Sequence, residues 1–127
     1  MKKAFVLLVL IVGVLLAGGL GAQSNGKTIN FISVTADGDS GKMTEFIELQ
    51  LSGAGIDDLR RNDIIITPGI TIGSWRFFKS GGVLIYEFYF NSVQQTQELT
   101  VSIEKPGYTV TPPSRTVMIF NGKTPAP

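Results

Sequence analysis

Residues 71–90 read TIGSWRFFKSGGVLIYEFYF, and this stretch decides the fold. Two runs rich in β-branched and aromatic residues, the composition typical of strands, flank the dipeptide Gly81-Gly82. Glycine tolerates the positive φ angles of a two-residue type I′ turn, so the sequence predicts a β-hairpin with strands at 71–80 and 83–90. Counting outward from the turn places Arg76 opposite Glu87.

The side chains of this hairpin divide between two faces. An opposite-charge pair is costly to bury and a group of aromatic rings is costly to expose, so the aromatic face is expected to point into the core. Its members are Trp75, Phe77, Tyr86 and Phe88. The opposite face, which we call the outer patch, is the candidate interaction surface and contains Phe78, Ile85, Tyr89, Arg76 and Glu87. Apolar side chains clustered on a solvent face indicate a partner surface, unless a loop or the terminal segment covers them.

Short segments of alternating apolar and polar residues continue along the rest of the chain, separated by Gly, Pro, Asn, Asp and Ser. Further strands are expected at 28–35, 45–51, 63–67, 98–105 and 115–120, with a short extended piece at 108–110. In the first of them Ile29 and Phe31 share one face and Ile32 and Val34 the other, which indicates either a β-bulge or a change of sheet. The connection at 52–62 carries Ile56 and Leu59, which we expect to pin it to the core. With no amphipathic helix in this part, the sequence predicts an all-β sandwich.

The N-terminal residues have the pattern of an export signal. Lys2 and Lys3 precede an apolar run from Ala4 to Ala17, and a stretch of small residues ending at Ala22 follows. We therefore expect residues 1–22 to be a cleaved signal peptide, 23–27 a short linker, 28–120 one domain and 121–127 a flexible tail. The alternative is an uncleaved signal sequence that anchors the chain in the membrane. Either way the domain is exported, to the periplasm, the cell surface or the medium.

Composition excludes several classes of function. The chain has no His and no Cys, so it lacks imidazole bases, thiol nucleophiles and the usual zinc ligands. The close carboxylate pairs are Glu45 with Glu48 and Asp57 with Asp58, which fit solvated strand and loop positions better than glycoside hydrolysis. After residue 22 the chain carries nine basic and ten acidic residues, so nothing favours nucleic acid as a partner. We expect no enzyme activity and no cofactor.

The segment from Asp37 to Gly41, DGDSG, has two interpretations. Carboxylates at alternate positions resemble the opening of a calcium loop, but the distal bidentate glutamate of such loops is missing at the expected spacing. The second interpretation is a turn built from residues that tolerate left-handed φ, and it is the one that we favour.

Three segments carry a resemblance to a known family. They are INFISVTADG at 29–38, LRRNDIIIT at 59–67, and 98–120, which ends in GYTVTPPSRTVMIF. In these the chain resembles the bacterial immunoglobulin-like repeat modules of exported surface proteins, although the stretch from Trp75 to Phe90 is richer in aromatic residues. The resemblance implies an immunoglobulin-like Greek-key β-sandwich of about seven strands. It implies a spacer or adhesive module and supplies no catalytic residues.

The expected function is therefore that of a non-catalytic interaction or structural module of the bacterial cell envelope or surface. The alternative is a carbohydrate-binding module that uses exposed aromatic residues, so the expected partner is a protein or a glycan of the envelope. Contact with a membrane is expected only through an uncleaved signal sequence. An exposed indole ring at Trp75 would favour the glycan.

Overall fold

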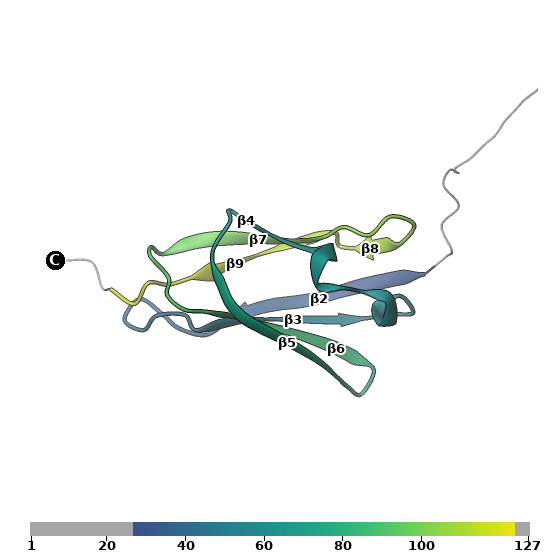
Figure 1. Ribbon diagram of the computed structural model, residues 1–127, viewed down its shortest axis with the longest axis horizontal. Helices are drawn as coiled ribbons and strands as arrows, with labels where there is room; N and C mark the ends of the chain where they lie inside the picture. Colours follow the sequence, from purple (N-terminus) through teal and green to yellow (C-terminus); the bar gives the residue numbers. More distant parts are fainter. Residues whose placement is uncertain (1–26, 124–127) are drawn as a thin grey trace, which may run out of the picture.

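The computed structural model describes residues 27–123, and these form two β-sheets with two single turns of 3₁₀ helix. The five-stranded sheet has the order β5-β6-β3-β2-β8, and the three-stranded sheet has the order β4-β7-β9. Figure 1 shows the two sheets stacked as layers, with the chain crossing from β4 in one layer to β5 in the other. The all-β, sandwich-like fold expected from the sequence is thus present.

The strands lie close to the expected ranges. Those of the larger sheet are β2 (Thr28–Ala36), β3 (Phe46–Ser52), β5 (Ile72–Ser80), β6 (Val83–Phe90) and β8 (Thr109–Thr111). Those of the smaller sheet are β4 (Ile64–Thr67), β7 (Gln97–Ile103) and β9 (Ser114–Ile119). The 3₁₀ turns η2 (Ile56–Asp58) and η3 (Arg61–Asp63) lie between β3 and β4.

The core lies between the sheets and is formed mainly by the inward-facing residues of β2, β3, β4, β6, β7 and β9. Alternation along β3 buries Ile47, Leu49 and Leu51 fully, because successive strand residues point to opposite faces. Ile56 and Leu59 of the connection at 52–62 are buried as well, as expected. Burial of these side chains supplies the stabilisation that a chain without cysteine cannot obtain from disulfides.

The expected bulge is present in β2, where the pairing with β3 shifts between Phe31 and Ser33. The extra residue leaves Ile32 exposed and returns Val34 to the inner face, where it pairs with Leu49. On its other side β2 pairs in parallel with β8, but only over residues 28–30. Beyond that point this side of β2 pairs with no strand in the described part of the chain, whereas its other side stays paired with β3.

One expectation about the core was wrong. Tyr86 and Phe88 are buried, but Trp75 is 43% exposed and Phe77 is 55% exposed. All four share the inner face, so the face was assigned correctly and the burial was not. The three-stranded sheet ends at β4, and β5 lies beyond the area that it covers, as its exposed residues from 73 to 80 indicate. The inner face of β5 therefore meets water.

The predicted signal peptide at 1–22 and most of the predicted linker and tail lie outside the described residues, so these expectations stay predictions. None of the helical segments within 27–123 has the length and apolar character that crossing a bilayer requires.

Candidate interaction site on the β5–β6 hairpin

The hairpin has the predicted turn and register. Gly81 and Gly82 have φ angles of 58° and 81°, as a type I′ turn requires, and an added Cβ would meet nothing within 4 Å at either position. Glycine is therefore needed for its backbone conformation and not for space. Arg76 pairs with Glu87, and Trp75 pairs with Phe88. In Figure 1 the tip of the hairpin points away from the three-stranded sheet.

Two exposed rings on the inner face of β5, Trp75 and Phe77, form what we call the aromatic shelf. Their centroids are 6.0 Å apart and their planes are inclined by 14°. Both rings stack on Tyr86, at 6.1 Å from Trp75 and 5.1 Å from Phe77. The buried Tyr86 thus fixes two large apolar side chains in an ordered arrangement at the surface, which is the pattern of a binding surface.

Lys79 follows the shelf on the same face and forms an ion pair with Asp57 of η2. Beside this pair lies a hollow of about 250 Å³. Its lining is mostly apolar and includes Phe77, Ile56 and Leu84. The shelf therefore ends in an apolar hollow next to an exposed ion pair.

The outer patch lies on the opposite face, as its register requires, and is internally bonded. The Glu87 carboxylate accepts hydrogen bonds from Arg76 Nε at 2.5 Å and from the Tyr89 hydroxyl at 2.8 Å. Arg76 also lies over the Phe78 ring, 5.5 Å from its centroid. Glu87 is buried, Ile85 and Tyr89 are half-buried, and Phe78 is exposed. Arg76 and Phe78 are thus its accessible members, and its role as an interaction surface stays a prediction.

The hydrogen bonds to Glu87 predict a pH dependence of stability. The hydrogen bond from Arg76, and to a smaller extent that from Tyr89, holds the pKa of the Glu87 carboxyl below its usual value of 4.5. A lowered pKa in the folded state stabilises the fold above the unfolded-state pKa, and this contribution is lost as the pH falls through the folded-state pKa. We expect Glu87→Gln to lower the free energy of unfolding at pH 7 by about 1–2 kcal/mol. The deficit should shrink below pH 4.5, as urea denaturation at several pH values would measure.

Glu98→Gln is the control for this variant, because Glu98 is an exposed glutamate on β7. It should leave the unfolding free energy within about 0.5 kcal/mol of the wild type at each pH. A Glu87→Gln deficit that stayed constant from pH 7 to pH 3 would contradict the role given to the carboxylate.

The backbone of β5 forms an unpaired edge in the described part of the chain, since β5 ends the sheet order. In a two-residue hairpin the residues flanking the turn, here Ser80 and Val83, exchange backbone hydrogen bonds, and such pairs then alternate along the strands. The N–H and C=O groups of Trp75, Phe77 and Lys79 therefore point away from β6. The same three residues carry the side chains of the shelf and its cationic end.

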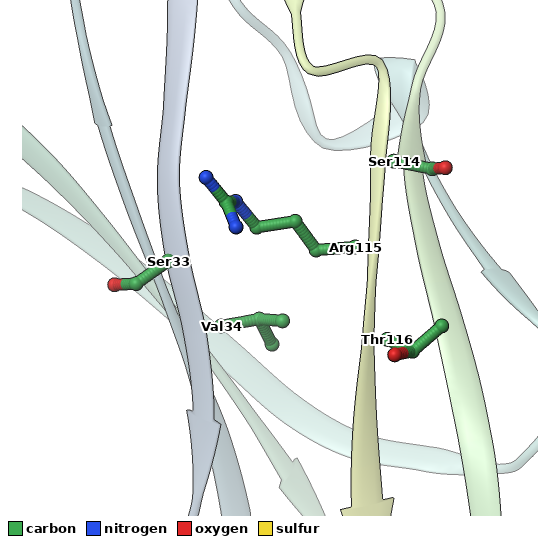
Figure 2. Close-up of a pocket in the computed structure, with 5 residues that line it drawn as sticks. All are labelled: Ser33, Val34, Ser114, Arg115 and Thr116. Atoms are coloured by element: carbon green, nitrogen blue, oxygen red, sulfur yellow. The ribbon is translucent and has the colours of Figure 1, made fainter.

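A second hollow lies between β2 and β9, where no strand pairs with either edge among the described residues. It measures about 440 Å³ and is lined by Ser33, Val34, Ser114, Arg115 and Thr116. Figure 2 shows the Arg115 guanidinium reaching across to β2, whereas the Ser33 and Ser114 hydroxyls point away from it. Arg115 Nε donates to the Phe31 carbonyl at the bulge, at 2.7 Å. The arginine thus links the sheets, and the polar groups do not converge on a ligand position.

The turn at Asp37 uses its carboxylates for backbone hydrogen bonds. Asp37 Oδ1 accepts from the Glu45 and Phe46 N–H groups at 2.7 and 3.1 Å, and Asp39 Oδ1 accepts from the Gly41 N–H at 2.8 Å. Such hydrogen bonds from an aspartate to nearby backbone groups are typical of turns, and they favour the second interpretation of this segment. Within residues 27–123 no group of three or more Asp, Glu, His or Cys side chains is placed to hold a metal ion.

The carboxylate pair Asp57 and Asp58 is held by cations. Asp58 accepts hydrogen bonds from Lys27 at 2.8 Å and from the Tyr108 hydroxyl at 2.6 Å, and Asp57 pairs with Lys79. The hydrogen bond from Lys27 lowers the pKa of Asp58 most, and the hydrogen bond from Tyr108 lowers it further. A general acid in glycoside hydrolysis needs a raised pKa, so these contacts fit a structural role.

No family model matches the chain, and neither a curated protein nor a solved structure does.

Proposed function

We propose that residues 28–120 form an immunoglobulin-like Greek-key sandwich that serves as an exported, non-catalytic interaction module. In that fold one sheet contains the fourth, fifth, second and first strands, and the other contains the third, sixth and seventh. The orders β5-β6-β3-β2 and β4-β7-β9, with β8 as a short addition, support this assignment.

Export is supported by the basic residues Lys2 and Lys3, the apolar run that follows them and the small residues up to Ala22. The protein recovered from the exported fraction is expected to begin at Gln23, which N-terminal sequencing would establish. An exported protein that kept Met1 would contradict cleavage.

The binding surface in this proposal is the β5–β6 hairpin, and one observation carries it. Among residues 27–123, β5 alone combines an edge that no strand pairs with and exposed aromatic side chains on both faces, with Trp75 and Phe77 on the inner face and Phe78 on the outer face. Exposed hydrophobic edge strands attract further strands, and domains that do not use them usually keep them short or charged. A partner that adds a strand at this edge would satisfy the backbone groups and cover both faces.

The second candidate function is glycan binding, and exposure of Trp75 favours it. Sugar rings stack on flat aromatic surfaces, and the nearly parallel rings of the aromatic shelf offer one. Trp75 is the single tryptophan of the chain, so its fluorescence would report a ligand on the shelf directly. A blue shift on titration with soluble envelope glycans, absent with Phe77→Ser, would favour this candidate over a protein partner.

The protein-docking proposal is tested by replacing the shelf. Wild-type protein immobilised and exposed to the solubilised envelope fraction is expected to retain a specific protein, and the double variant Trp75→Ser with Phe77→Ser should lose it. Ile65→Ser is the matched control, because Ile65 is an exposed apolar residue on β4, the edge strand of the other sheet. A protein that the wild type and the double variant retain equally would overturn the proposal.

A further inference from the structure

We infer that β5 pairs with β5 of a second copy of this chain, antiparallel and in the register that places Phe77 opposite Phe77. The inference rests on the proposed function, since it names the occupant of the same hairpin surface. Three properties of β5 indicate a second copy as the partner: its unpaired backbone groups, the exposed side chains on its two faces and the positions of its charges.

The two exposed faces of β5 favour a strand over a flat ligand. A ring system stacked on Trp75 and Phe77 would leave Phe78, 41% exposed on the other face, in water. A strand added at the edge carries side chains on both faces and contacts both sets. It also bonds the outward N–H and C=O groups, which have no backbone hydrogen-bond partner within residues 27–123.

The register of the proposed pairing follows from the regular part of β5 and from the positions of its charged residues. Pairing of β5 with β6 is uninterrupted from Ser74 to Ser80, and a bulge precedes it. A two-fold axis at Phe77 pairs that whole regular segment with its copy. An axis at Arg76 would oppose two arginines, an axis at Lys79 would oppose two lysines, and like charges directly opposite destabilise a sheet. Axes at Trp75 or Phe78 would use the bulge or shorten the pairing.

The chosen register brings complementary groups together. Phe77 meets its copy at the axis, and on either side Trp75 faces Lys79 of the other copy, a cation–π pair that forms twice. On the outer face Arg76 lies opposite Phe78 of the other copy, repeating the contact that these residues make within one chain.

The charges of β5 do not oppose this self-pairing. Each copy neutralises its own cations, since Arg76 bonds Glu87 on the neighbouring strand and Lys79 bonds Asp57 of η2. The joined edges would make one continuous sheet from the two five-stranded sheets, with the aromatic shelf covered by its counterpart.

Sedimentation velocity over a range of protein concentrations is the first test. The wild type is expected to form a dimer as the concentration rises. Phe77→Lys, which opposes two lysines at the axis, should weaken dimerisation at least about tenfold. Ile65→Lys, the same change on the edge strand of the other sheet, should leave dimerisation unchanged. A wild type that sediments as a monomer at every concentration would overturn the inference.

Single cysteines test the register, because the chain has none of its own. Phe77→Cys is expected to form a disulfide-linked dimer readily on mild oxidation. Trp75→Cys alone should cross-link slowly, but a mixture of Trp75→Cys with Lys79→Cys should cross-link as the mixed dimer. Cross-linking of Phe77→Cys no faster than that of Ile65→Cys would contradict the register.

These results separate the inference from the proposed function. A monomeric wild type whose retained envelope protein is lost in the shelf variant would remove self-pairing and leave the docking surface standing. A dimer with the predicted cross-links and no retained envelope protein would support self-pairing and identify the second copy as the occupant.

Discussion

Replacing Phe88 with alanine is expected to lower the free energy of unfolding by about 3–5 kcal/mol. The Phe88 side chain is fully buried, stacks on Tyr86 with 5.8 Å between centroids, and lies under the guanidinium of Arg61. Truncation to alanine removes these contacts and leaves a cavity that close-packed neighbours cannot fill. Urea denaturation followed by circular dichroism would measure the loss.

The control for Phe88 is its partner across the hairpin. Trp75 pairs with Phe88 in the register and points to the same face, but it is 43% exposed. Trp75→Ala should therefore cost less than about 1.5 kcal/mol, although tryptophan is the larger residue. Equal losses for the two variants would mean that the smaller sheet covers β5 after all.

Replacing Thr44 with valine is expected to lower the free energy of unfolding by about 2–4 kcal/mol. Thr44 is fully buried where the chain enters β3, and its hydroxyl makes two backbone hydrogen bonds. It donates to the Asp37 carbonyl at 2.8 Å and accepts from the Phe120 N–H at 2.9 Å. Valine has nearly the same shape but cannot form these bonds, so it leaves the partly buried Asp37 carbonyl and Phe120 N–H without this partner. Thermal and urea denaturation would measure the effect.

Thr96→Val is the matched control for Thr44. The Thr96 hydroxyl also bonds the segment after β9, accepting from the Asn121 N–H at 3.2 Å, but this bond is exposed. Water replaces it, so the variant should lose less than about 0.5 kcal/mol. A Thr44→Val variant as stable as Thr96→Val would show that the buried hydroxyl does not hold the turn at Asp37 to the segment after β9.

The hairpin was predictable from the sequence because the residues that determine its turn and register are neighbours in the chain. The dipeptide Gly81-Gly82 sets the turn, the turn sets the register, and alternation then assigns every side chain to a face. The bulge after Phe31 was predictable for the same reason, since the apolar period breaks there.

Exposure of the aromatic shelf was not predictable in the same way, because burial depends on what the other sheet covers. A face is a property of one strand, whereas coverage depends on how many strands the opposite layer has and where it ends. Pro68, directly after the short β4, was the available signal, since it ends the edge strand of the smaller sheet. The partial burial of the outer patch depends similarly on the bonds that Tyr89 and Arg76 make to Glu87.

Amide hydrogen exchange along β5 tests the central claim most directly, because each amide reports whether its own edge is paired. In dilute protein the Arg76, Phe78 and Ser80 amides should be protected by β6, and those of Trp75, Phe77 and Lys79 should exchange rapidly. At high concentration the second set should become protected as well. Protection of all six amides in the dilute protein would mean that the edge is already paired, and would contradict the account.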